Sequence, residues 1–211
     1  MRIAKSILPI SLLVLLMTAS SVHAALQSRL NGQAYYDTDT NLTWTTNANI
    51  YGTPPPDSGG GGRATWYNAM VWVETLRVEG VGGWRLPISD PACYSVEELC
   101  AASEHSVLYY QTLGNSYGAL VNTGPFINIQ TTFRYWTGSL DPDWGDNSYG
   151  LSYFMSSGEQ WRDVKAANLW MWAVQSGDVS NVPIPAAAWL FGSALIGLGA
   201  LKRKKVATSA S

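Results

Sequence analysis

Basic residues are scarce in the middle of this 211-residue chain. Six of the 13 lysines and arginines lie among the first five or the last ten residues, and Lys165 is the only lysine between residues 25 and 179. All 15 acidic residues lie between Asp37 and Asp178, so residues 25–179 carry a net charge of 7 − 15 = −8. Nucleic-acid binding needs clustered lysine and arginine opposite the phosphates. The composition therefore argues against nucleic acid as a partner and is compatible with cations, neutral glycans or simple solubility.

Cysteine is almost as rare, since Cys93 and Cys100 are the only two. Two cysteines cannot form a typical structural zinc site without histidine, and His105 is the only histidine near them. An exported compartment permits a disulfide between these cysteines, which are seven residues apart. We expect the bond to close a local loop, with two free buried thiols as the alternative.

Motifs of catalysis are also missing. The sequence contains no Gly-x-Ser-x-Gly, no His-Glu-x-x-His and no phosphate-binding loop. Glu97 and Glu98 are adjacent, so on a helix they point apart and cannot flank one bond. The glycine run at 59–62 follows prolines rather than a strand, which indicates a surface loop. We therefore predict a protein that is not an enzyme and has no cofactor, with calcium as the one ion to consider.

Apolar runs lie only at the two ends of the chain. Arg2 and Lys5 precede an apolar run over residues 7–17, and Val22-His23-Ala24 offers small or compact residues where a signal peptidase cuts. This pattern is typical of a secretory signal peptide. We predict a signal peptide over residues 1–24, with an uncleaved N-terminal helix as the alternative.

The second apolar run, residues 186–201, has no charged residue and is followed by four cations at 202–205. Its 16 residues would span about 24 Å as a helix, slightly less than a hydrocarbon core of about 30 Å. Snorkelling cations compensate for this deficit, and they place the basic tail in the cytoplasm. We predict a transmembrane helix with an extracytoplasmic middle region; a buried C-terminal helix is the alternative.

The middle region, residues 25–179, is long enough for one domain with its own core. Apolar periodicity predicts a helix over residues 64–78, and a capping box from Ser95 to Glu98 predicts a second over residues 95–104. Later segments alternate with a period of two, which indicates strands at 133–137, 149–155, 160–164 and 169–174. The pattern predicts an α+β domain with two early helices and an antiparallel sheet.

Tryptophan is abundant, with nine of the ten in the middle region. Trp84 beside Arg85 is a candidate for stacking against sugar rings, although core packing is the alternative for most tryptophans. Arg85 has the further alternative of anchoring its loop through a carboxylate or carbonyls. Trp144 lies in a polar loop and is the one we expect to be exposed. The other tryptophans considered for the platform are Trp136, Trp161, Trp170 and Trp172.

Two groups of oxygen-bearing side chains are candidates for calcium, which takes six to eight oxygen ligands. The alternative for both groups is that aspartate and asparagine are common in turns. The first group is Asp141, Asp143, Asp146 and Asn147, and the second is Asp37, Asp39 and Asn41.

Four characteristic segments follow one another along residues 31–178: Asp-Thr-Asp-Thr-Asn-Leu-Thr-Trp (37–44), Gly-Gly-Trp-Arg-Leu-Pro (82–87), Tyr-Trp-Thr-Gly-Ser (135–139) and Trp-Ala-Val-Gln-Ser-Gly (172–177). In this respect the chain resembles the DUF1566 family, also called the Lcl C-terminal domain. The resemblance implies a C-type-lectin-like fold and a place among exported bacterial adhesins and surface proteins.

The C-terminal 32 residues, 180–211, resemble a PEP-CTERM sorting signal, close to the Val-Pro-Leu-Pro-Ala variant. The resemblance implies processing by an exosortase at the inner membrane of a Gram-negative bacterium, then transfer to the cell surface or extracellular matrix, often beside exopolysaccharide production. The motif is Val182, Pro183, Ile184, Pro185 and Ala186; the membrane helix 186–201 follows, and the basic tail is Lys202, Arg203, Lys204 and Lys205.

These features together predict an exported surface or matrix protein whose lectin-like domain is adhesive or binds extracellular polysaccharide in a biofilm. The first alternative is a structural matrix protein without a specific ligand. The second is an enzyme on a lectin-like fold, because fold alone does not exclude catalysis.

Overall fold

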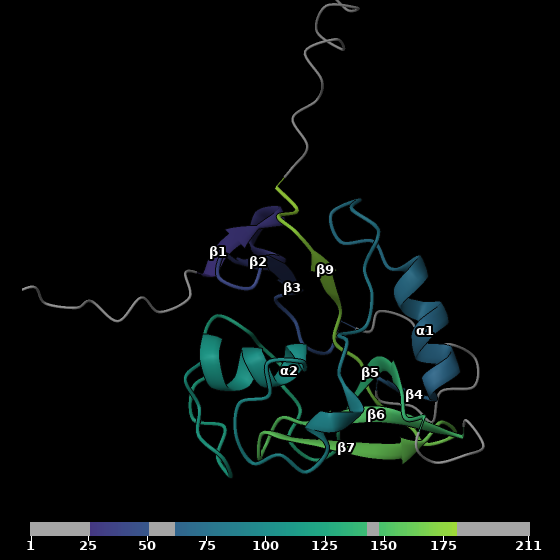
Figure 1. Cartoon of the computed structure of the whole chain (residues 1–211). Helices are drawn as coiled ribbons and strands as arrows, with labels where there is room; N and C mark the ends of the chain where they lie inside the picture. Colours follow the sequence, from purple (N-terminus) through teal and green to yellow (C-terminus); the bar gives the residue numbers. More distant parts are fainter. Residues whose placement is uncertain (1–25, 51–61, 143–147, 181–211) are drawn as a thin grey trace, which may run out of the picture.

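The computed structural model describes residues 26–50, 62–142 and 148–180. These residues form two β-sheets with helices and long loops between them (Figure 1). The first sheet has four antiparallel strands in the order β1-β2-β3-β9. Its strands are β1 (Leu26–Arg29), β2 (Ala34–Asp37), β3 (Leu42–Thr45) and β9 (Val174–Ser176). The sheet therefore joins the start of the described chain to its end.

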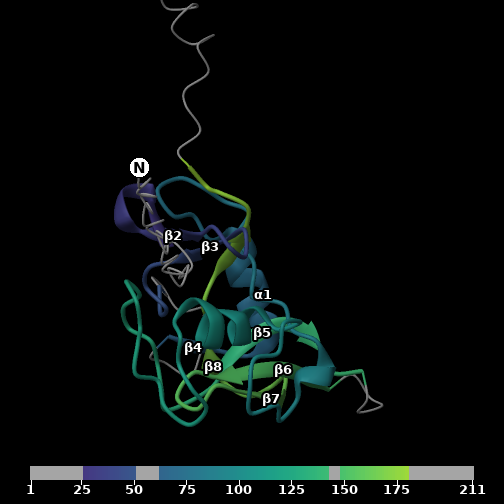
Figure 2. The same cartoon turned by 60° about the vertical axis from the view of Figure 1, so that its left-hand side comes forward.

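The second sheet has five strands in the order β4-β8-β5-β6-β7. All neighbouring strands are antiparallel except β5 and β8, which are parallel. Figures 1 and 2 both place this sheet at the opposite end of the domain from β2 and β3. Its strands are β4 (Arg63–Ala64), β5 (Tyr135–Leu140), β6 (Tyr149–Phe154), β7 (Glu159–Val164) and β8 (Leu169–Trp170).

The first predicted helix is confirmed as α1 (Trp66–Thr75). Thr65 caps it, because its side chain accepts a hydrogen bond from the Asn68 backbone N–H. Leu76 leaves the helical conformation with ψ of 135°, so α1 is shorter than predicted at both ends. The buried side chains of α1 are Ala69 and Val73. Four strands precede this helix, so the helices do not come first as we had predicted.

The predicted helix over residues 95–104 is wrong. Ser95 has a positive φ of 56°, whereas a helix N-cap residue is normally extended. The helix begins instead at α2 (Glu104–Ser106) and continues as a six-residue π-helical stretch, η3 (Val107–Thr112). Residues 95–103 thus belong to a loop.

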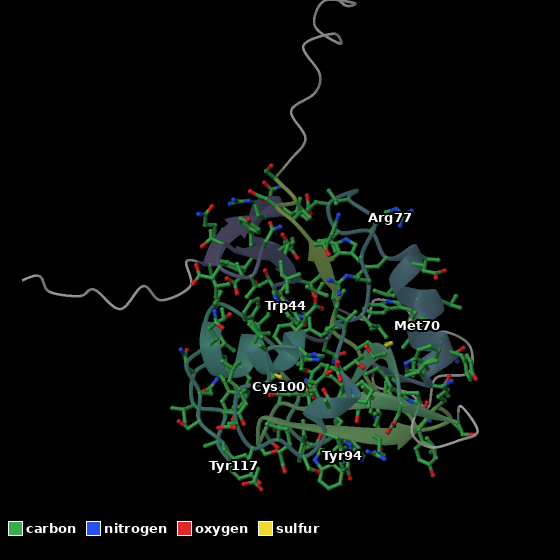
Figure 3. The ribbon with its side chains drawn as sticks, viewed as in Figure 1. Trp44, Met70, Arg77, Tyr94, Cys100 and Tyr117 are labelled. Carbon is green, nitrogen blue, oxygen red and sulfur yellow. A yellow bond between two sulfur atoms is a disulfide. The ribbon has the colours of Figure 1, made fainter. Side chains whose placement is uncertain are left out.

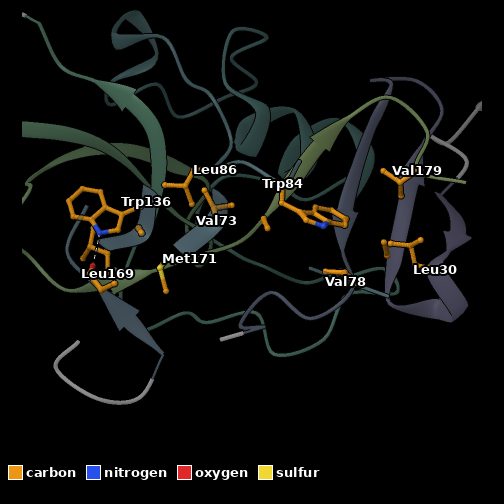
Figure 4. Packing of buried hydrophobic residues seen from close by; sticks show 13 residues of the cluster. Leu30, Val73, Val78, Trp84, Leu86, Trp136, Leu169, Met171 and Val179 are labelled. Carbon is orange, nitrogen blue, oxygen red and sulfur yellow. Dashed lines mark hydrogen bonds between the residues drawn. The ribbon is translucent and has the colours of Figure 1, made fainter. Parts of the chain in front are cut away.

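Two hydrophobic clusters fill the domain. The helix-side cluster lies beneath α1 and contains two large indoles, those of Trp84 and Trp136 (Figure 4). The aromatic cluster lies between the first sheet and η3 and is built around Trp44 and Trp172, both almost fully buried. Its remaining aromatic members are Tyr109, Phe126, Tyr135, Tyr153 and Trp170.

The strand predictions after residue 133 are confirmed for β5, β6 and β7, with small shifts at their ends. The predicted strand 169–174 is only partly right. Leu169, Met171 and Ala173 enter the helix-side cluster, while the residues between them enter the aromatic cluster. The segment therefore has the predicted period of two, but it crosses from β8 in one sheet to β9 in the other. Strands β1 to β4 were not predicted; the fold is α+β with more sheet than helix.

The two ends of the described chain are held together. Arg29 in β1 forms a two-pronged ion pair with Asp178, with N···O distances of 2.5 and 2.8 Å. Within residues 26–50, 62–142 and 148–180, no helix has the length and apolar content that a membrane span requires. The predicted signal peptide 1–24 and membrane helix 186–201 lie outside these ranges.

Candidate functional site

The Gly-Gly-Trp-Arg-Leu-Pro segment, residues 82–87, connects both sheets. Arg85 exchanges two backbone hydrogen bonds of 2.9 Å with Val174 in β9. Two residues later, the Pro87 carbonyl accepts a hydrogen bond of 2.8 Å from Gly138 in β5. Gly83 has φ of +84°, a conformation that side chains other than hydrogen disfavour. The segment therefore has a structural role at the centre of the domain.

Trp84 does not form a sugar-stacking surface. Its side chain belongs to the helix-side cluster and only 3% of the residue is exposed (Figure 4). The indole N–H donates to the Val81 carbonyl at 2.9 Å. The stacking prediction for Trp84 is therefore wrong, because the large apolar ring gains more from the core than a loop position can offer.

Arg85 adopts the anchoring alternative. Its guanidinium donates to both carboxylate oxygens of Glu104, each at 2.7 Å, and to the Ser176 hydroxyl at 3.0 Å. Glu104 Oε2 also accepts the Ile88 backbone N–H at 2.8 Å. Glu104 is the first residue of α2, where a negative charge is favourable. The ion pair thus fixes the start of the helix to the motif and to β9.

The Cys93–Cys100 disulfide is confirmed. The loop that it closes lies next to α2, as Figure 3 shows for Cys100. The Cys100 backbone N–H donates to Ser106 Oγ at 2.8 Å, and the following residues pair antiparallel with the chain around Ser89. The disulfide therefore positions the segment that leads into Glu104.

A groove of about 400 Å³ lies where these segments meet the turn between β2 and β3. Its volume is within the range of about 300–1,000 Å³ that is typical of small-molecule sites. No lysine, arginine or histidine lines it among the described residues. The lining residues are Asp39, Thr40, Leu42, Ile88, Ala101, Ala102, Glu104, Val107 and Gln111.

The turn that forms one side of the groove is organised by Asp37. This buried carboxylate accepts the Asp39 backbone N–H at 3.0 Å and the Thr112 hydroxyl at 2.6 Å. Asn41 Oδ1 accepts the hydroxyl of Tyr36 at 2.9 Å. The polar atoms of Asp37 and Asn41 are therefore used within the fold, which supports the turn interpretation over a calcium site at Asp37, Asp39 and Asn41.

Only one member of the other calcium candidate lies within the described residues. Asp141 is buried, and its Oδ2 is 3.0 Å from Arg162 Nε. An arginine this close occupies the position that a cation would take. In the part of the chain that the structure describes, no three His, Cys, Asp or Glu side chains are grouped as metal ligands. Asp143, Asp146, Asn147 and the predicted exposed Trp144 lie outside the described residues.

Of the other candidate tryptophans, three are buried and one is half-buried. Trp136, Trp170 and Trp172 are buried, which confirms core packing for them. Trp161 on β7 is only half-buried, with the Arg134 guanidinium 5.3 Å from the ring centroid and Tyr94 in edge contact. Tyr94 lies at the outer side of the domain near β7 (Figure 3). Sequence reasoning missed this pair because the two residues are 67 positions apart, 161 − 94.

His105 was considered only as a metal ligand, but it lies in the aromatic cluster. It is fully buried, and its ring stacks on Tyr153 with centroids 5.2 Å apart. Neither ring nitrogen has a hydrogen-bond partner among the described residues. Burial lowers the pKa of His105 from its ordinary 6.5 to about 3. The imidazole is therefore neutral at physiological pH and faces the core rather than the groove.

No protein-family model matches this chain, and the comparisons with curated proteins and with solved structures gave no match either. The two resemblances drawn from the sequence therefore stay predictions that depend on the residues that carry them.

Proposed function

We propose that this chain is an exported surface or matrix protein whose C-type-lectin-like domain binds a glycan in the groove. The observation that carries the proposal is the groove itself. Ile88, which directly follows the Gly-Gly-Trp-Arg-Leu-Pro segment, lines it together with Glu104, which Arg85 holds in an ion pair. A rigid concave surface next to the most characteristic motif is the default place to expect a ligand.

The lining of the groove supports a carbohydrate over a purely apolar ligand. The lining includes the aliphatic residues Leu42, Ile88 and Val107 as well as the polar residues Thr40 and Gln111. A sugar ring presents apolar C–H groups and hydroxyls together, so it needs both kinds of partner.

The arrangement of the chain ends supports display at a surface. Arg29 and Asp178 hold the two ends of the described chain at one end of the domain. The five-stranded sheet lies at the other end (Figures 1 and 2). Attachment through the predicted C-terminal signal would therefore leave the second sheet pointing away from the attachment point.

Binding is tested with residues 25–181 on a glycan array, with calcium and with a chelator. Both hydrophobic clusters are made from residues within this fragment. We expect binding to at least one class of glycan. If the folded fragment binds none in either condition, the recognition proposal fails and a structural matrix protein becomes the better explanation.

Export and sorting are tested by mass spectrometry of the protein released by the native bacterium. We expect a mature N-terminus at Ala25 and loss of residues 202–205. Released protein that still carries these four residues would contradict sorting by an exosortase, while an N-terminus at Met1 would contradict the signal peptide.

A further inference from the structure

We infer that the groove recognises an amino-sugar unit whose amine is protonated, an inference that rests on the proposed glycan-binding function. Two carboxylates line the groove, those of Asp39 and Glu104. The charge of Glu104 is balanced by Arg85 through two hydrogen bonds of 2.7 Å. The uncompensated charge in the groove is therefore that of Asp39.

The carboxylate of Asp39 is available to a ligand. Asp39 is exposed and forms no ion pair with any described residue. Its Oδ1 accepts one long hydrogen bond of 3.4 Å from Thr38 Oγ1, while the buried Asp37 organises the turn. A carboxylate held on a rigid turn and aimed at no internal partner is a ready acceptor for an ammonium group.

Neutral polar groups beside Asp39 suit the hydroxyls of the same sugar. Thr40 lines the groove, and its buried hydroxyl has no hydrogen-bond partner among the described residues. The amide of Gln111 hydrogen-bonds to none of the residues that the structure describes. A bound hydroxyl group would pair with the exposed amide of Gln111, which an apolar ligand cannot do.

The charge of the whole domain favours the same class of ligand. Residues 25–179 carry a net charge of −8, counted from the sequence, and no cation lines the groove among the described residues. Glycans rich in uronic acid or sulfate would be repelled both at Asp39 and over the longer range. Neutral glycans would lack the ion pair. The chemistry therefore selects a polysaccharide with free amino groups.

The test uses the full chain in a mild detergent without a sugar head group. Its ligands are three oligosaccharides of equal length: glucosamine units, N-acetylglucosamine units and uronic-acid units. At a pH where the amine is protonated, we expect the tightest binding to the glucosamine oligomer. D39N removes the charge at nearly constant shape, and we expect it to weaken this binding about five- to tenfold. The matched control is E74Q, which removes one exposed charge from α1, outside the groove.

A second pair of variants tests the location without changing charge. A102W fills the groove and should abolish binding, while A166W adds the same ring at another exposed position and should leave it unchanged. Equal weakening by D39N and E74Q would show general electrostatic attraction, and full binding by A102W would place the binding site outside the groove. Either result would overturn the inference. Tighter binding to the N-acetylated or uronic oligomer would overturn it while the proposed function stands. Binding to no glycan at all would remove both.

Discussion

The buried histidine makes the stability of the domain depend on pH in a window where few other groups titrate. Burial lowers the pKa of His105 to about 3 in the folded state, against 6.5 in the unfolded chain. Below pH 6.5 the unfolded chain binds a proton that the folded domain does not. His105 therefore leaves the unfolding free energy unchanged above pH 6.5 and lowers it progressively as the pH falls from 6.5 toward 3.

The size of the effect follows from the two pKa values. Each unit of separation corresponds to about 1.4 kcal/mol, so the whole shift is equivalent to about 5 kcal/mol. Between pH 7 and pH 4.5, the unfolding free energy should fall by about 2–3 kcal/mol. The exposed Asp178 also has a lowered pKa, but its ordinary value is 3.8, so it acts below this window. The window therefore isolates the histidine.

The assay is urea unfolding of residues 25–181 at several pH values from 7 to 4.5, with tryptophan fluorescence as the signal. H105F keeps an aromatic ring in the cluster and removes the titrating nitrogens, which have no hydrogen-bond partner among the described residues. We expect the variant to lose most of the pH dependence of the parent. A parent whose unfolding free energy is constant over this range, or an H105F variant with the same slope, would refute the burial argument.

Three further predictions concern the structure around the groove. Replacing Cys93 and Cys100 together by alanine should lower the unfolding free energy by about 2.5 kcal/mol relative to the oxidised parent, because the disulfide closes an eight-residue loop (100 − 93 + 1). Chemical unfolding under oxidising conditions measures this loss. The double variant should be as stable as the parent with its disulfide reduced, and a difference between these two would contradict the loop-closure account. E104Q should lower the unfolding free energy by about 1–2 kcal/mol in the same assay, because it removes the two-pronged ion pair with Arg85. The stability of the variant should also depend less on salt concentration than that of the parent. An unchanged salt dependence would argue against the ion pair. Gly158→Ala should destabilise the domain by about 1–3 kcal/mol more than Gly177→Ala. Both glycines have φ above +80°, but only at Gly158 would the added methyl carbon lie 2.6 Å from tyrosine atoms. Equal decreases in melting temperature for the two variants would contradict this packing.

Sequence patterns predicted the elements whose signal is local. Helix α1 has apolar spacing and a threonine cap, and a turn that contains Ser156, Ser157 and Gly158 separates strands β6 and β7. The predicted helix at 95–104 failed because Ser95 is held at positive φ inside the disulfide loop, and a capping-box pattern cannot report that. Strands such as β4, with two residues, carry no periodic signal at all.

The groove could not be predicted from the sequence, because four separate segments meet there. Arg85 was recognised as a candidate, and the alternative of a carboxylate partner proved correct, but Glu104 was 19 residues away with no local pattern to connect them. The same limit applies to His105. Its isolation among aromatic rings depends on contacts with Trp44 and Tyr153, which are remote in the sequence.

The route by which β9 leaves the domain has a mechanical consequence. Tension applied to the C-terminal end of the chain acts first on Asp178, which Arg29 holds, and then on β9, which three residue pairs hold against β3. The same strand carries Ser176, which bonds Arg85, and Val174, which pairs with its backbone. A load on the C-terminal attachment would therefore reach the Arg85–Glu104 ion pair within a few residues. Under the proposed attachment to a surface, flow or traction would act on the geometry of the groove itself.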